Sequence, residues 1–182
     1  IDPAGNITVI VDSFVPREQQ SRVASELMKL DNSVEQVGFL EKPDDPCCAV
    51  RLQMMGGEFC GNASLSAAAV IFSRAGLGKG LYCEELFEVS GAPEPVKISG
   101  HMVNSSCFEG EVAMPLPESI SECSFLDGFE GYTFPLVRFP GICHAIVPAG
   151  AINPERAEAV IASWCRQLSA DALGLMFFDR DK

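Results

Sequence analysis

One cysteine lies in a setting that could make its thiol reactive. The stretch from Met55 to Ser66 reads Met-Gly-Gly-Glu-Phe-Cys-Gly-Asn-Ala-Ser-Leu-Ser and runs into an alanine-rich segment with helical periodicity. Cys60 should therefore stand at or just before a helix N-terminus, where free backbone N–H groups and the helix dipole stabilise a thiolate. The same N–H groups could hold a substrate carboxylate. The sequence thus predicts an acid/base group and an anion-binding site in one place.

The residues around Cys60 favour a functional site over a plain helix entry. Gly61 removes side-chain bulk, so that a ligand can approach the backbone, and Asn62 can cap the helix or bind a ligand. The tripeptide Cys-Gly-Asn by itself does not distinguish this site from a buried cysteine followed by an ordinary turn. The additional glycines at 56 and 57 give more backbone freedom than such a turn requires.

Three other segments offer polar side chains where strands are expected to begin. Asn6 precedes the first strand, Glu35 and Gln36 precede an apolar strand, and His144 precedes a later one. Taken singly, each has an ordinary structural interpretation: a turn, a solvated strand start and a satisfied structural histidine. They become candidates for the site only in combination with the Cys60 segment.

The first part of the chain should supply the elements that position these residues. Pro16 can open a helix whose apolar stripe is Val23, Ala24, Leu27, Met28 and Leu30. Gly76 is well placed to end the helix that follows Cys60. We expect strands over 7–14, 37–40 and 49–55, and helices over 17–30 and 62–74.

The later part of the chain alternates short strands and turns before a final helix and strand. Asn153-Pro154-Glu155 is a strong helix start, and the buried stripe of that helix should be Ala157, Val160, Ile161, Trp164 and Leu168. We expect strands over 86–90, 96–99, 111–114, 133–139, 144–147 and 173–178. This order predicts a mixed α+β fold, with a domain crossing at the proline-rich Met114–Pro117.

Composition and charge exclude several classes of protein. The 182-residue chain is 47% apolar and has a net charge of −12, so phosphate backbones and anionic membrane surfaces are poor partners. Its longest apolar runs are too short to cross a bilayer, and no signal peptide opens the sequence. We therefore expect a cytoplasmic protein whose eight cysteines are reduced thiols. No cysteine or histidine spacing predicts a metal site.

Taken together, the motifs resemble the diaminopimelate epimerase superfamily, and within it the histidine racemases of metallophore biosynthesis. The matching blocks are Pro-x-Gly-Asn-x-Thr at 3–8, Glu-Gln-Val-Gly-Phe at 35–39 and Gly-x-Glu-Phe-Cys-Gly-Asn-Ala at 56–63. Looser matches follow at 89–91, at 144 with 147–148, and at 174–179. The resemblance extends over nearly the whole chain in order.

The resemblance implies racemisation of an amino acid without any cofactor. Two similar domains, each a curved sheet around a central helix, would each contribute a cysteine, one thiolate taking the α-proton while the opposite thiol delivers another. Cys60 matches the first catalytic cysteine, and Gly61 and Asn62 would face the substrate carboxylate. The remaining matches are Asn6, Gln36 and Gln53 as substrate-binding positions, with Glu35 and His144 in supporting roles. A homodimer is one assembly that this resemblance leaves open.

Two of the chain's departures from the epimerase pattern bear directly on its function. Ala63-Ser64-Leu65 follows Cys-Gly-Asn where diaminopimelate epimerases have Gly-x-Arg, which disfavours diaminopimelate as the substrate. Of the eight cysteines, only Cys60 precedes a glycine, so the second cysteine motif is not in this chain. We expect a first domain over 1–110 and the beginning of a second, truncated one over 111–182. Alone, this piece should not racemise amino acids.

Two other functions remain open at this point. A phenazine-pathway isomerase would share the fold but use a carboxylate, and Glu35 lies roughly where that subgroup has its glutamate. In that chemistry Cys60 would have no role, and that subgroup has a histidine where Asn62 stands. A small-molecule-binding or redox protein would merely expose the Cys60 thiol.

Overall fold

The chain divides into two compact units. The computed structural model describes residues 1–3, 5–76, 80–124, 128–129, 131–139, 141–170 and 172–179. Unit 1 comprises Ile1–Pro115 and unit 2 comprises Leu116–Lys182. The division falls within the proline-rich Met114–Pro117 segment, slightly beyond the expected boundary at 110.

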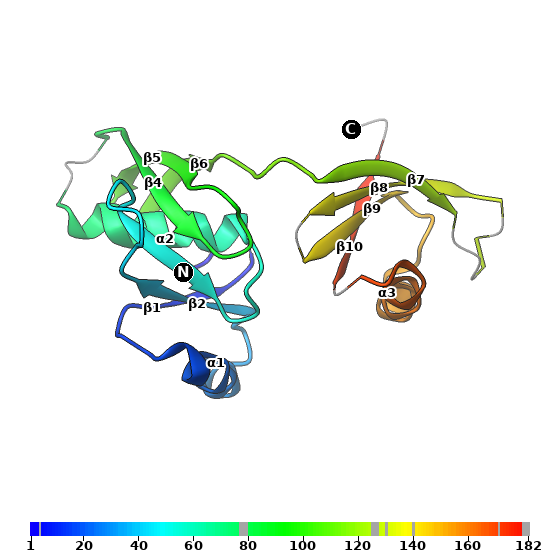
Figure 1. Cartoon of the computed structure of the whole chain (residues 1–182), viewed down its shortest axis with the longest axis horizontal. Helices are drawn as coiled ribbons and strands as arrows, with labels where there is room; N and C mark the ends of the chain where they lie inside the picture. The colour runs from blue at the N-terminus through cyan, green and yellow to red at the C-terminus, as the bar shows by residue number, and fades with distance from the viewer. Residues whose placement is uncertain are drawn as a thin grey trace. The chain divides into compact units, whose positions relative to one another are not determined.

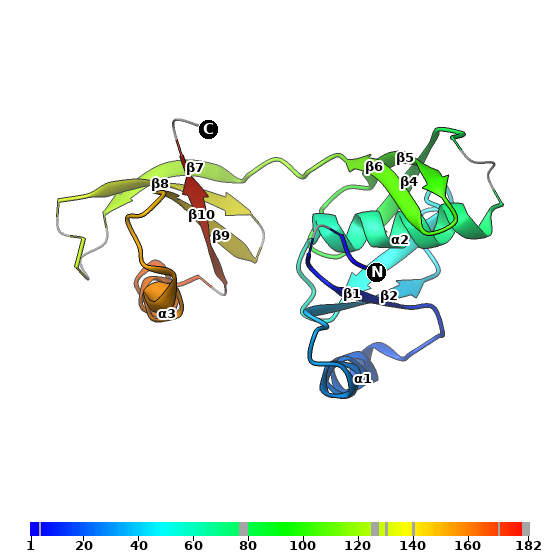
Figure 2. The same cartoon turned by 180° about the vertical axis from the view of Figure 1, so that it is seen from behind.

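Unit 1 is a six-stranded mixed sheet curled around a helix (Figures 1 and 2). The strands lie in the order β1-β2-β3-β4-β5-β6. They are β1 (Thr8–Val11), β2 (Gln36–Glu41), β3 (Val50–Met54), β4 (Cys83–Val89), β5 (Val96–Asn104) and β6 (Cys107–Val112). β1 is parallel to β2 and β3 to β4, whereas the other neighbours are antiparallel. The predicted mixed α+β class is therefore confirmed.

Two helices cover opposite faces of this sheet. Helix α2 (Gly61–Arg74) packs small residues, Ala63, Ala67 and Ala68, into one core, and Leu40 belongs to the same core. Helix α1 (Arg17–Leu30) packs on Val37 and Phe39 at the other face. Because side chains alternate along a strand, Gln36, Gly38 and Leu40 of β2 lie on the α2 side. None of the helices in the described part of the chain is long and apolar enough to cross a membrane.

Three expectations for unit 1 need correction. The first strand is shorter than the expected 7–14, because its pairing with β2 ends at Val11. Leu30 does not join the buried stripe of α1, because it is the last helical residue and is 84% exposed. The β5–β6 hairpin extends further than the expected strands at 96–99 and 111–114. It continues through the paired Gly100 and Gly110, because the ring of Phe108 lies where their side chains would be.

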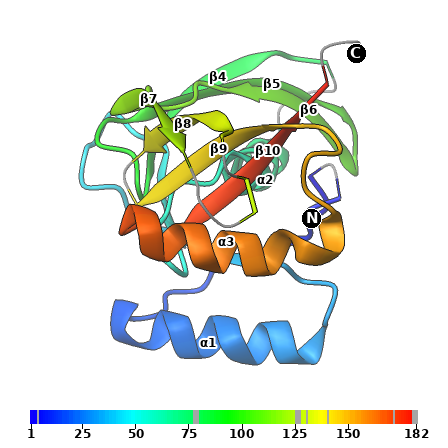
Figure 3. The ribbon, with the colours of Figure 1, turned by 90° about the vertical axis from the view of Figure 1, so that its right-hand side faces the viewer.

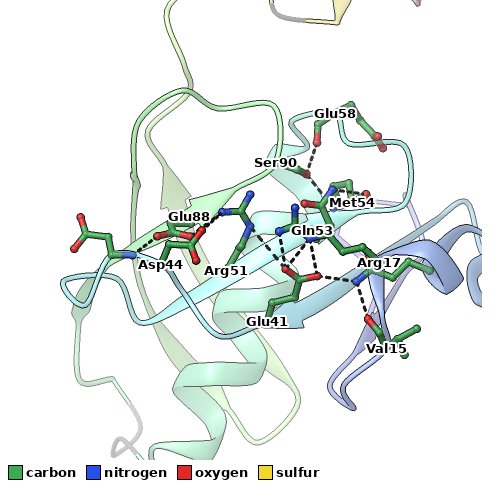
Figure 4. A network of polar contacts seen from close by, with 12 residues as sticks. Val15, Arg17, Glu41, Asp44, Arg51, Gln53, Met54, Glu58, Glu88 and Ser90 are labelled. Atoms are coloured by element: carbon green, nitrogen blue, oxygen red, sulfur yellow. Dashed lines mark hydrogen bonds and ion pairs between the residues drawn. The ribbon is translucent and has the colours of Figure 1, made fainter.

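A polar network ties β2, β3 and β4 together away from the α2 core (Figure 4). Arg51 forms ion pairs with Glu88 at 3.0 Å and Asp44 at 3.2 Å, while Arg17 pairs with Glu41 at 2.8 Å. Burial acts to raise the pKa of Glu41, but hydrogen bonds from Arg17 and Gln20 outweigh it, so the pKa lies below its ordinary value. Glu41 therefore remains ionised and holds α1 on the sheet.

Unit 2 is a four-stranded sheet covered by one helix (Figure 3). Its elements are β7 (Ser119–Ser124), β8 (Thr133–Phe139), β9 (Ile142–Pro148), α3 (Pro154–Leu168) and β10 (Leu173–Phe178), with the sheet order β10-β9-β8-β7. Asn153 caps α3 as predicted, since its Oδ1 accepts a hydrogen bond from the N–H of Glu155 at 3.0 Å. The buried indole of Trp164 packs against the ring of Phe134 with their centroids 5.5 Å apart.

Candidate active site

Cys60 is the N-cap residue of α2. Its backbone is extended, and its Sγ accepts a hydrogen bond from the N–H of Ala63 at 3.4 Å. Its carbonyl accepts bonds from both the N–H and the hydroxyl of Ser64, at 3.0 and 2.8 Å. The cysteine therefore lies at the helix entry, as the sequence predicts. Asn62 does not cap the helix, because Cys60 takes that position itself.

The first turn of α2 leaves two backbone donors available. The first N–H groups of a helix have no partner within it. Cys60 takes those of Ala63 and Ser64, and among the described residues no acceptor reaches those of Gly61 and Asn62. With the positive end of the helix dipole, these two N–H groups make a place for an anion beside the thiol. A Cβ at Gly61 would be 3.3 Å from Met114 Sδ, so a side chain there would require Met114 to shift slightly.

A cavity of about 690 Å³ runs along the adjoining side of α2. Asn62 and Ser66 of the helix line it together with the N-terminal residues 1–3 and the β5–β6 turn. Ser66 Oγ is buried there without a hydrogen-bond partner among the described residues. Cys60 is not among the residues that line this cavity. Asn62 thus lies at the boundary between the cavity and the helix entry.

Four side chains connect Cys60 to the edge of the sheet through hydrogen bonds. Cys60 Sγ donates to Gln36 Oε1 at 3.0 Å. Gln36 Nε2 donates to Asn6 Oδ1 and, at 2.7 Å, to Thr8 Oγ1. Asn6 Nδ2 donates in turn to Glu35 Oε2 at 2.8 Å. We call these five side chains, those of Asn6, Thr8, Glu35, Gln36 and Cys60, the Cys60 network.

The Cys60 network brings together most of the residues expected at the site. The sequence predicts Asn6, Glu35 and Gln36 as site residues, whereas Thr8 appears in it only as part of the first matching block. Thr8 is fully buried and pairs with Gln36 across the parallel strands β1 and β2. A threonine within a strand carries no functional signal by itself. Only the register of β1 against β2 could have indicated its place.

The loop before Cys60 is held by the end of β4. Ser90 Oγ accepts a hydrogen bond from the N–H of Met54 and donates one to the carbonyl of Glu58, each at 2.9 Å (Figure 4). The next residue, Gly91, has a φ of +73° and lies against the backbone of Phe59, where a Cβ would collide. Ser90 and Gly91 therefore fix the path of the chain into Cys60.

Replacing Gly91 by alanine should destabilise unit 1 more than the same change at Gly76. Both glycines have positive φ, which costs about 1 kcal/mol for alanine, but only Gly91 has backbone within reach of the new Cβ. Urea unfolding should show a loss for Gly91→Ala that exceeds that of Gly76→Ala by at least about 1 kcal/mol. Equal losses would mean that the Phe59 backbone moves aside freely.

Two expected site residues lie outside the Cys60 network of unit 1: Gln53 is on the other side of the sheet and His144 belongs to unit 2. Gln53 lies beside Phe39 on the α1 side of the sheet, and its Nε2 donates to the carbonyl of Met54 at 3.1 Å. His144 belongs to β9 of unit 2, where its ring packs on Gly174 and meets Phe139 edge to face at 5.8 Å. Burial lowers the pKa of His144 below 6.5, so its imidazole is neutral at neutral pH.

The cysteines and acidic residues form no further centre in the part of the chain that the structure describes. All eight cysteines are free. Within the described residues, no three His, Cys, Asp or Glu side chains gather closely enough to hold a metal ion. The chemistry that the described site offers therefore rests on a thiol, amide groups and two backbone donors.

The chain shares the diaminopimelate epimerase-like fold of several solved structures. A structure of a predicted epimerase from Pseudomonas aeruginosa matches with a TM-score of 0.59 at 18% identity, over 94% of this chain and 64% of that one. A hydroxyproline epimerase from Agrobacterium vitis matches with a TM-score of 0.59 at 15% identity, over 87% of this chain and 54% of that one.

Sequence comparison then assigns the family: the chain belongs to the histidine racemase CntK N-terminal domain family, which it matches over residues 1–182. A histidine racemase from Fusobacterium nucleatum subsp. nucleatum is 34% identical over the whole of this chain and 66% of its own length. One from Staphylococcus aureus is 26% identical, again over the whole chain and 66% of its own length. The chain thus spans about two thirds of these relatives.

Proposed function

We propose that this chain binds histidine and transfers a proton at its α-carbon, with Cys60 as one of the two acid/base groups of a racemase that needs no cofactor. The observation that carries the proposal is the position of Cys60 Sγ at the N-terminus of α2. Beside it lie the N–H groups of Gly61 and Asn62, which have no acceptor among the residues that the structure describes. The histidine racemases among the relatives support histidine as the substrate.

In the proposed reaction, the substrate carboxylate binds the N–H groups of Gly61 and Asn62. One acid/base group breaks the Cα–H bond and takes the proton, while the other delivers a proton to the opposite face of the α-carbon. The charge that develops between these steps spreads onto the carboxylate, where the fixed N–H dipoles stabilise it. Cys60 acts on one face, and a second acid/base group acts on the other.

The Cys60 network disfavours Glu35 as the reacting base. Its carboxylate bonds to Asn6, which bonds to Gln36, so that two amide side chains separate Glu35 from Cys60. The isomerase alternative with a carboxylate base would also leave Cys60 without a role. We therefore retain Glu35 as a supporting residue.

Protection of Cys60 from alkylation tests the proposal on the chain itself. Histidine should slow the reaction of Cys60 with iodoacetamide several-fold, measured for each cysteine by peptide mass spectrometry. Histamine, which lacks the carboxylate, should not protect it. The exposed Cys47 serves as the internal control, since its rate should not change with either compound. Equal protection by histidine and histamine, or none, would contradict binding of the carboxylate at the α2 N-terminus.

A further inference from the structure

We propose that Thr8 and Glu35 are positioning residues that fix the direction of the hydrogen bonds in the Cys60 network, so that Cys60 keeps its proton while the site is empty. This inference rests on the proposed function of Cys60 as an acid/base group. It assigns Cys60 the role of proton donor at the start of the reaction.

Thr8 fixes the orientation of Gln36 from inside the sheet. A hydroxyl group has one proton to donate, and Thr8 donates it to the carbonyl of Asn6 at 3.1 Å. Toward Gln36, Thr8 Oγ1 can therefore only accept. The Gln36 atom that lies 2.7 Å from it must be the amide nitrogen Nε2. Because Thr8 is fully buried, no water competes for this bond.

Glu35 imposes the same orientation from the solvent side. An ionised carboxylate only accepts hydrogen bonds, so the Asn6 atom that lies 2.8 Å from Glu35 must be Nδ2. The oxygen of the Asn6 amide is then left to face Gln36, where it accepts from Nε2. Both N–H donors of the Gln36 amide are thereby used, one for Asn6 and one for Thr8.

The only free end of the Gln36 amide is its oxygen, and it faces the sulfur. Gln36 Oε1 lies 3.0 Å from Cys60 Sγ and cannot donate, so the thiol must. If Cys60 lost its proton, its negative charge would face the negative end of the amide dipole. Turning the amide over would break its bonds to both Asn6 and Thr8. The two anchors thus favour the protonated sulfur and oppose the Ala63 N–H and the helix dipole, which favour the thiolate.

The direction of these hydrogen bonds determines which group donates a proton first in the proposed reaction. Cys60 enters it as a thiol, its S–H bond breaks, and a Cα–H bond forms on its face of the substrate. The base on the opposite face takes the original α-proton. Cys60 is then a thiolate, and the Gln36 amide must turn or the sulfur must regain a proton before the next cycle.

The test measures the reactivity of Cys60 in the purified chain without any amino acid. The thiolate is the form that reacts with iodoacetamide, so releasing an anchor should accelerate alkylation at pH 7.5. Thr8→Val removes both hydroxyl bonds at nearly constant volume, and Glu35→Ala removes the carboxylate. Each single variant should accelerate alkylation of Cys60 about fivefold, because one hydrogen bond contributes about a fivefold factor. The double variant should accelerate it at least about tenfold. Cys47 should react at an unchanged rate.

Matched variants separate positioning from packing. Thr8→Ser keeps the hydroxyl and should react like the unchanged protein, whereas Thr133→Val makes the same substitution at an exposed site in unit 2 and should have no effect. Equal rates for Thr8→Val and Thr8→Ser, or slower alkylation in Glu35→Ala, would overturn the proposal. If Thr8→Val fails to fold, the exposed Glu35 still decides the question. Because no histidine is present, failure here leaves the protection by histidine a separate result.

Discussion

Replacing Cys60 by serine should lower histidine racemisation by about a thousandfold. A positioned acid/base group contributes on the order of 10² to 10⁴ in rate, and a serine hydroxyl cannot exchange protons with carbon at neutral pH as a thiol can. Serine is also a favoured N-cap, so α2 should keep its start and the loss should be chemical rather than structural. The measurement needs both acid/base groups. It therefore uses residues 1–182 joined to the last third of the Fusobacterium relative, with D- and L-histidine separated by chiral chromatography.

The exposed Cys47 supplies the control for this experiment. Cys47→Ser should leave the rate of the hybrid enzyme within about twofold, since surface substitutions away from special features have small effects. Thermal unfolding should show both variants folded to the same extent. A Cys60→Ser hybrid that keeps a tenth or more of the activity would remove Cys60 from the reaction.

Replacing Phe134 by alanine should destabilise unit 2 by about 3 to 5 kcal/mol, the usual cost of removing a buried phenylalanine. Phe134 is 2% exposed and its ring contacts those of Phe129, Tyr132 and Trp164. A unit of this size has little stability beyond such a loss, so unit 2 should be largely unfolded. Because the chain has a single tryptophan, fluorescence of Trp164 during urea unfolding reports on unit 2 alone.

Two further measurements make the Phe134 result specific. Ile120→Ala, at a 70% exposed position on β7, should change the stability by less than about 0.5 kcal/mol. Hydrogen exchange in Phe134→Ala should rise through β8, β9 and β10 while α2 stays protected, because unit 1 has its own core. A loss of protection in α2 of the same size would show that the two units unfold together.

The elements with strong local signals were predictable from the sequence. Helix α3 begins at an asparagine cap followed by proline, and β8 and β10 have the bounds that their apolar runs predict. Strand β7 was missed, because Ser119–Ser124 is polar and almost wholly exposed, so only its pairing with β8 makes it a strand. The strands predicted for the β5–β6 hairpin are too short for a related reason, since glycines normally weaken strands. The ring of Phe108 covers the two paired glycines, and this contact depends on the pairing of the strands.

The part of the candidate site that lies in one segment of the sequence could be predicted. The part that depends on how neighbouring strands are paired could not. The glycines around Cys60 and the helical pattern after it place the thiol at the helix entry. Alternation in β3 instead turns Gln53 to the α1 side, away from Gln36, although both residues matched substrate-binding positions. Thr8 required knowledge of which residue it faces in β2. Such cross-strand relations cannot be read from a single sequence.

The pairing of Ile1 with Thr8 has a practical consequence for recombinant work. The carbonyl of Ile1 accepts a hydrogen bond from the Thr8 N–H at 2.8 Å. A sequence change at Ile1 that weakened this bond would act on the strand that carries Thr8. Reactivity measurements on Cys60 should accordingly use protein in which residues 1–8 are unchanged.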